Sequence, residues 1–232
     1  MDGMISEAYG HRLGERARVE NAPAIVSRAL RNADMAVTEV RCDNPRPGLS
    51  GPIRPEDAFL VSVQLRDFPH REYWSDGRRA SVCDLRAGET SLHDLRRDPV
   101  TLLDKPYHSL VVYLPRAVLD AIADEANAPR IRDLNYKPGA GVSDVTMSSL
   151  GSLLLPALRH PDQANPLFVD HVLLAVVAHA RDDFQQRDDK NWLKHTVAWK
   201  DADWKVTFDY RPVRLNTLSN EVESFPPAER TH

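Results

Sequence analysis

The sequence predicts an α+β fold in which a small β-barrel or sandwich comes first and a layer of helices follows. Between residues 35 and 115 the apolar residues mostly recur at every second position, which is the period of half-buried strands. From residue 116 they recur at the spacing of amphipathic helices. Strands that precede the helices, rather than alternate with them, are typical of α+β domains. With 232 residues the chain is long enough for one sizeable core, or for one core with an appendage.

The N-terminal end is the least patterned part of the chain. Residues 1–22 are polar, so we expect a flexible N-terminus there. A short helix is predicted over 23–33, because Pro23 suits the first position of a helix. Residues 44–57 are dense in proline and glycine, which is typical of a loop.

The strands are predicted from alternation and from turn residues. Their expected ranges, the third including a turn, are 35–43, 58–68, 87–99 and 108–115. Within the second of these, the apolar side chains on one face are those of Phe59, Val61, Val63 and Leu65. Residues 70–85 predict a hairpin, because Asp76-Gly77 is a favoured two-residue turn.

Three helices are predicted after the strands, over 116–126, 144–158 and 167 to about 180. We expect Ser143 to cap the second helix, and Asn165-Pro166 to cap and open the third. The third is apolar on nearly all sides, so it either lies centrally in the core or forms half of a dimer seam.

Composition narrows the function classes. The formal net charge is −4, so there is no overall positive field to hold nucleic acid. The two cysteines, Cys42 and Cys83, lack the spacing of a zinc site, and scattered thiols indicate a reducing compartment. With no secretory signal and no apolar run of about 18 residues, we expect a cytoplasmic protein without a membrane span.

Residues from about 24 to 179 resemble the N-terminal half of AraC-type transcriptional regulators. The resemblance is carried by an ordered series of segments, among them "FLVSVQLRDFPHREYWSDGR" (59–78) and "LLLPALRHPDQANPLFVDHVLLAVVAH" (153–179). It implies a cupin-like barrel with helices that senses a small effector and dimerises. In such regulators two helix-turn-helix units come next, but the sequence after His179 does not have their pattern.

An effector pocket is predicted around "LRDFPHREYW" (65–74). Arg66, His70, Tyr73 and Trp74 offer hydrogen-bond donors and flat aromatic faces for a small polar or aromatic ligand. Neighbouring residues of a strand point to opposite faces, so at most one of Tyr73 and Trp74 points inward. The alternative is that these aromatic residues belong to the core or the rim of the barrel.

A metal-dependent cupin enzyme is a third interpretation. It would need converging histidines and a carboxylate, whereas His70, His93 and His108 stand alone on different predicted segments. We therefore expect no metal. The carboxylates of 181–183 and 187–189 are interpreted as a solvated face rather than as cation ligands.

The last part of the chain, from about residue 178 to 232, is similar to the C-terminus of succinate dehydrogenase and fumarate reductase flavoprotein subunits. The matching pieces, in order, are "AHAR" (178–181), "RDD" (187–189), "NWLKHT" (191–196), "DYRPV" (209–213) and "FPPAER" (225–230). Arg181 and His195 match positions of that family. Residues 195–213 predict a β-hairpin appendage.

The two resemblances meet near residues 178–181, so the sequence predicts a fusion with domains over 23–179 and 180–232. No glycine-rich dinucleotide fingerprint is present, so no cofactor is expected. FAD is expected only under the alternative interpretation, in which the chain is a flavoprotein fragment. The favoured hypothesis is a non-enzymatic effector-sensing and dimerising domain without the DNA-binding half of its family. Its expected partners are a small-molecule effector and a second copy or an intact paralogue, paired through the helix at 167–177, and we expect no DNA binding from this chain alone. The alternative is a catalytically incomplete flavoprotein fragment.

Overall fold

The structure is a computed structural model that describes residues 8–30, 34–80, 84–125, 130 and 133–186. The chain divides into two compact units, residues 1–193 and 194–232, and the second lies outside the described residues. The predicted hairpin over 195–213 therefore also lies outside them.

The described elements run from strands to helices after one short N-terminal helix. In chain order they are α1 (Gly10–Arg16), β1 (Ala24–Ser27), β2 (Met35–Cys42), β3 (Gly48–Leu49), β4 (Ala58–Gln64), β5 (Tyr73–Ser75), β6 (Arg78–Arg79), β7 (Glu89–Asp94), β8 (Val100–Leu103), β9 (Tyr107–Pro115), α2 (Arg116–Glu125), β10 (Val142–Ser143), α3 (Val145–Arg159) and α4 (Pro166–Gln186), with 3-10 turns at Leu95–Arg97 and Pro161–Gln163. The prediction of a mixed fold with strands first and helices after is confirmed.

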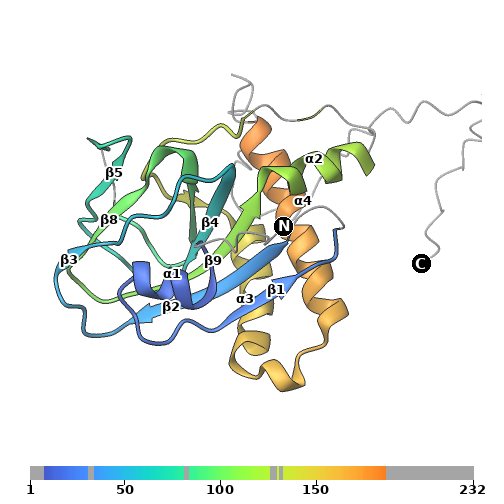
Figure 1. The fold of residues 1–232 in the computed structure, drawn as a ribbon, viewed down its shortest axis with the longest axis horizontal. Helices are drawn as coiled ribbons and strands as arrows, with labels where there is room; N and C mark the ends of the chain where they lie inside the picture. Colours follow the sequence, from blue (N-terminus) through green and yellow to red (C-terminus); the bar gives the residue numbers. More distant parts are fainter. Residues whose placement is uncertain (1–7, 31–33, 81–83, 126–129, 131–132, 187–232) are drawn as a thin grey trace, which may run out of the picture. The chain divides into compact units, whose positions relative to one another are not determined.

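Two antiparallel sheets make up the β part. The larger has the strand order β1-β2-β9-β4-β7-β10, and the smaller has the order β3-β8-β5-β6. In Figure 1 the smaller sheet lies on one side of the larger one, and α2, α3 and α4 lie on the other. The ladders of the described residues form two separate sheets, so a sandwich describes the fold better than a closed barrel.

Strand alternation divides the apolar residues between two cores. In β4, Phe59, Val61 and Val63 face the helices and join one buried cluster with residues of α2, α3 and α4. Leu65 packs against the same cluster, so the predicted face is confirmed. The intervening residues of β4 face the smaller sheet, where Leu60 joins the second cluster. The larger sheet therefore has one face for packing on helices and one face toward the other sheet.

The N-terminal prediction was wrong in two places. Residues 10–16 form α1, and its Leu13 is buried in the cluster between the sheets, where burial of one apolar side chain anchors an otherwise polar segment. Residues 24–27 form β1 rather than a helix, pairing with β2 from Ala24↔Thr38 to Ser27↔Met35. The β-branched Ile25 and Val26 favour a strand, and the open edge of β2 supplies the hydrogen-bond partners.

The turn and most of the helix boundaries were predicted correctly. Asp76 and Gly77 both have positive φ, and they join Trp74↔Arg79 and Ser75↔Arg78 in a two-residue hairpin. The cap of α3 is Asp144 rather than Ser143, because the Asp144 carboxylate accepts from the Met147 N–H at 2.8 Å, while Ser143 belongs to β10 and pairs with Glu89 of β7.

Helix α4 is longer than predicted and packs largely within the domain. Val169, Val172, Leu173, Val176 and Val177 are buried in the cluster that covers the larger sheet. At its beginning the Asn165 side chain accepts from the Phe168 N–H at 3.3 Å, as expected of a cap.

Near that beginning α4 presents apolar side chains to the outside. Leu167 is 64% exposed and Phe168 is 45% exposed. None of the described helices is long and apolar enough to cross a membrane.

Candidate functional site

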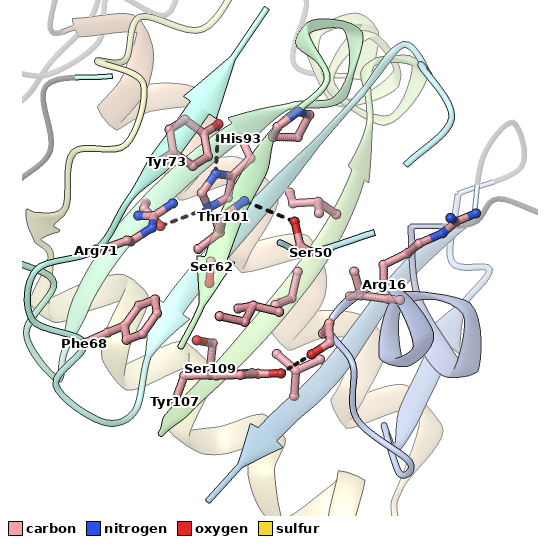
Figure 2. Close-up of a pocket in the computed structure, with 18 of the residues that line it drawn as sticks. Arg16, Ser50, Ser62, Phe68, Arg71, Tyr73, His93, Thr101, Tyr107 and Ser109 are labelled. Atoms are coloured by element: carbon pink, nitrogen blue, oxygen red, sulfur yellow. Dashed lines mark hydrogen bonds between the residues drawn. The ribbon is translucent and has the colours of Figure 1, made fainter. Parts of the chain in front are cut away.

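A cavity of about 140 Å³ lies between the two sheets. Strands β2, β4, β7 and β9 supply one wall, β5 and β8 supply the opposite wall, and α1 lies at one edge. Most of its surface is apolar and comes from residues such as Leu60, Leu85 and Val111. Figure 2 shows Arg71, Tyr73 and His93 together at one end of the cavity, with Phe68 and Tyr107 toward the other.

Arg71 is a buried cation at this polar end. Its side chain is 5% exposed, its guanidinium lies 4.7 Å from the centre of the Tyr73 ring, and Nη1 donates to the Gly139 carbonyl at 3.4 Å. No carboxylate among the described residues lies within ion-pair distance of it. Burial lowers the pKa of Arg71 to about 10, so the side chain stays charged at neutral pH.

Loop geometry holds Arg71 in place. Gly139 has φ of +78°, and a Cβ built there would meet the Tyr73 ring at 3.0 Å. Glycine at this position therefore lets the backbone between α2 and α3 approach the ring and present its carbonyl to the guanidinium.

A chain of hydrogen bonds runs beside Arg71. The Tyr73 hydroxyl lies 3.2 Å from His93 Nδ1, and His93 Nε2 lies 3.2 Å from Ser91 Oγ. Burial, together with the nearby Arg71 charge, lowers the pKa of His93 to about 3, so the ring is neutral at physiological pH. A neutral imidazole has one donor and one acceptor nitrogen, so the chain has a direction and ends in a hydroxyl that can donate further.

The rest of the polar lining consists of neutral side chains. Ser109 donates to the Gln64 side-chain oxygen at 2.8 Å, which leaves the amide N–H groups of Gln64 for another partner. Ser62, two residues before Gln64 on the same face of β4, also lines the cavity. No described residue that lines the cavity is acidic.

The structure separates the four residues predicted to form the pocket. Tyr73 lines the cavity, whereas its neighbour Trp74 does not, which agrees with the expectation that at most one of them points inward. Arg66 forms an ion pair with Asp43 at 2.8 Å, near the surface.

His70 lies outside the cavity, and its side chain is 87% exposed. Sequence reasoning missed Arg71 as a pocket residue, although the alternation that places Tyr73 inward also places residue 71 on the same face.

The three histidines considered for a metal do not converge. His93 faces the cavity, His70 is exposed, and His108 lies on the opposite face of the larger sheet with its Nε2 2.8 Å from Glu39 Oε1. Within the part of the chain that the structure describes, no three His, Cys, Asp or Glu side chains are grouped as metal ligands would be.

The two residues that match the flavoprotein family do not form a described site. Arg181 lies in the C-terminal half of α4, half-buried, with a buried Nε that has no hydrogen-bond partner among the described atoms. His195 lies outside the described residues.

Comparison with known proteins found two different likenesses. Residues 177–232 match the family model for the fumarate reductase flavoprotein C-terminus. Over 55 residues the chain is 51% identical to the succinate dehydrogenase flavoprotein subunit of Rickettsia bellii and 53% identical to the mitochondrial subunit of Oryza sativa. Each alignment covers 24% of this chain and 9% of the relative, so the chain spans less than a tenth of the length of these relatives.

Solved structures also align with part of the chain, at low TM-scores. The AraC-like transcriptional activator CuxR aligns with a TM-score of 0.37 and 11% identity, covering 69% of this chain and 60% of that one. A cupin 2 conserved barrel domain protein from Salinispora arenicola aligns with a TM-score of 0.29 and 16% identity, covering 45% of this chain and 85% of that one.

Proposed function

We propose that residues 23–179 form the small-molecule-sensing and dimerising domain of an AraC-type transcriptional regulator in the cytoplasm. The observation that carries the proposal is the cavity between the sheets, in which the Arg71 guanidinium is buried without a carboxylate partner among the described residues. The ordered series of segments that resembles the sensor half of these regulators supports it independently.

The polar end of this cavity is better explained by binding than by stability. A buried charge that is not paired destabilises a fold, and an apolar side chain of similar size would fill the same space. Ligand sites commonly combine an apolar lining with a few polar groups that fix orientation, which is the distribution seen here.

The proposed domain also provides a route from the cavity to the end of the sensor domain. Arg71 binds the loop that carries Gly139, and this loop leads through β10 to Asp144, the cap of α3. Asp144 in turn accepts from His179 Nε2 of α4 at 2.8 Å. A change at the cavity can therefore reach α4 through a continuous set of contacts.

The expected partner is a second copy of the domain or an intact paralogue, and the exposed Leu167 and Phe168 of α4 support pairing at that end. Sedimentation of the purified chain should show a dimer that the double substitution of both residues to serine dissociates. We expect no tight, specific DNA binding by this chain alone, and a salt-sensitive gel shift with an operator would contradict this.

Ligand binding in the cavity is the direct test. A panel of small polar and aromatic compounds should include some that raise the melting temperature of the protein, because binding to the native state stabilises it. Ser62→Phe, which fills the cavity, should abolish the shift, whereas Ser152→Phe on the exposed face of α3 should preserve it. Compounds that stabilise both variants equally would contradict binding in the cavity.

A second candidate function is that of a flavoprotein fragment, favoured by the family match over residues 177–232. The cavity between the sheets does not fit FAD, because its volume of about 140 Å³ is too small for a dinucleotide. A flavin absorbance band in the purified protein would support this candidate, and a colourless protein would favour the sensor.

A further inference from the structure

We propose that the ligand of the cavity is a small monocarboxylic acid with an apolar body, bound with its carboxylate against Arg71. This inference rests on the proposed sensing function and specifies the chemical class of the effector. It is drawn from the charge, the hydrogen-bond donors and the size of the cavity.

The charge of the cavity requires an anion. Other arginines of the domain are held by carboxylates: Arg66 by Asp43 at 2.8 Å, Arg116 by Asp57 at 2.8 Å and Arg96 by Asp94 at 2.6 Å. Arg71 is more deeply buried than these three, and yet within the described part of the chain its polar contacts are a carbonyl and an aromatic ring. A ligand carboxylate would supply the missing counter-charge.

Hydrogen-bond donors converge on the same end of the cavity. A guanidinium has five N–H groups, and only one of those of Arg71 is directed at Gly139. The Tyr73–His93–Ser91 chain ends in a hydroxyl that can donate to a ligand at this end. The Gln64 amide lies further along β4, beside Ser109, and is not part of this group. Figure 2 shows Arg71, Tyr73 and His93 close together on the cavity wall.

The single cation, the apolar lining and the volume of the cavity favour a carboxylate over a phosphate. At neutral pH a phosphate carries more than one negative charge, whereas Arg71 is the one cation at this end of the cavity among the described residues. The lining beyond the polar end is mostly apolar and favours a hydrocarbon body. Its volume of about 140 Å³ is close to that of an engineered cavity of about 150 Å³ that holds benzene.

The test compares an anionic and a neutral ligand of similar shape, with phosphate as a second anion. Benzoate, benzamide and inorganic phosphate are titrated against the full chain at pH 7, with binding followed by ligand-observed NMR. Benzoate should bind at least about tenfold more tightly than benzamide, because hydrogen bonds to a charged group are stronger than those to a neutral one. Phosphate should not compete with benzoate. Equal binding of benzoate and benzamide, no benzoate binding, or displacement by phosphate would each overturn the inference.

Two variants and a control assign the preference to Arg71. Arg71→Gln should bring the affinity for benzoate down to that for benzamide, and Arg71→Lys should restore part of the difference because it keeps the charge but not the planar fork. Arg78→Gln, an exposed position on β6, should leave the preference unchanged. If Arg71→Gln does not fold, as judged by circular dichroism, the inference is still tested by Arg71→Lys and by the affinities of the wild-type protein for benzoate and benzamide.

The outcomes separate this inference from the function on which it rests. If a neutral compound binds and Ser62→Phe blocks it, the sensing function stands and the carboxylate assignment fails. If no compound of either charge binds in the cavity, both fail.

Discussion

Replacing Arg71 with methionine should make the ligand-free protein more stable. Burial lowers the pKa of this side chain well below its ordinary value, to about 10, a difference that corresponds to about 3 kcal/mol of destabilisation of the charged form. Arg71 loses its proton at a higher pH in the unfolded chain than in the folded protein. The destabilisation of the folded state is therefore present in full below about pH 10 and disappears only as pH rises from there.

Some favourable contacts would be lost with the guanidinium. The stacking on the Tyr73 ring at 4.7 Å contributes about 0.5–2 kcal/mol, and the long hydrogen bond to Gly139 contributes at most about 1 kcal/mol. Methionine has a similar length and fills irregular apolar space. The free energy of unfolding should therefore rise by about 0–2.5 kcal/mol, with a central value near 1 kcal/mol, or roughly 2–4 °C in melting temperature for a domain of this size.

Urea denaturation at pH 7 measures this gain, with Arg78→Met as the control. Because Arg78 is exposed on β6, its substitution should change the free energy of unfolding by less than about 0.5 kcal/mol. The same Arg71→Met variant should lose its preference for benzoate over benzamide. A loss of stability of 1 kcal/mol or more in Arg71→Met would refute the reasoning, because it would mean that the buried charge is well compensated within the ligand-free protein.

Three further predictions concern the buried histidine, the cap of α3 and the helical core. Because the pKa of His93 is about 3 in the folded protein, only the unfolded chain takes up a proton on this imidazole below about pH 6.5. The free energy of unfolding should therefore fall by roughly 2 kcal/mol between pH 7 and pH 5. Urea titrations should show this loss diminished in His93→Gln and unchanged in His70→Gln; equal pH dependence in both would contradict it. Asp144→Ala should lower thermal stability by about 1 kcal/mol or more, whereas Ser143→Ala should have little effect; the reverse order would restore Ser143 as the cap. Leu173→Ala, in the fully buried part of α4, should reduce the free energy of unfolding by about 2–5 kcal/mol, and a loss below 1 kcal/mol would mean that α4 does not pack on the sheet as described.

Local patterns predicted the parts of this fold that local forces determine. The turn at Asp76-Gly77 follows from residues that tolerate positive φ, and the buried face of β4 follows from alternation. Residues 24–27 were misassigned because their state depends on pairing with β2, a partner that is not apparent from a single segment. Helix α1 was missed because a polar segment with a single buried leucine has no clear periodicity.

The site was predictable to a smaller extent. Tyr73 could be proposed from its aromatic character, but the importance of Arg71 lies in what surrounds it. Its hydrogen-bond acceptor is Gly139, 68 residues further along the chain, and the absence of an acidic partner among the described residues is a property of the folded arrangement. Ion pairing removed Arg66 from the predicted pocket in the same way, since Asp43 lies in a distant segment.

A crystal structure of the protein with benzoate tests the central claim most directly. The account predicts electron density for the ring between the two sheets, with the carboxylate oxygens about 2.7–2.9 Å from the guanidinium nitrogens of Arg71. An empty cavity at saturating benzoate, or an Arg71 side chain turned toward a carboxylate of the protein itself, would contradict it.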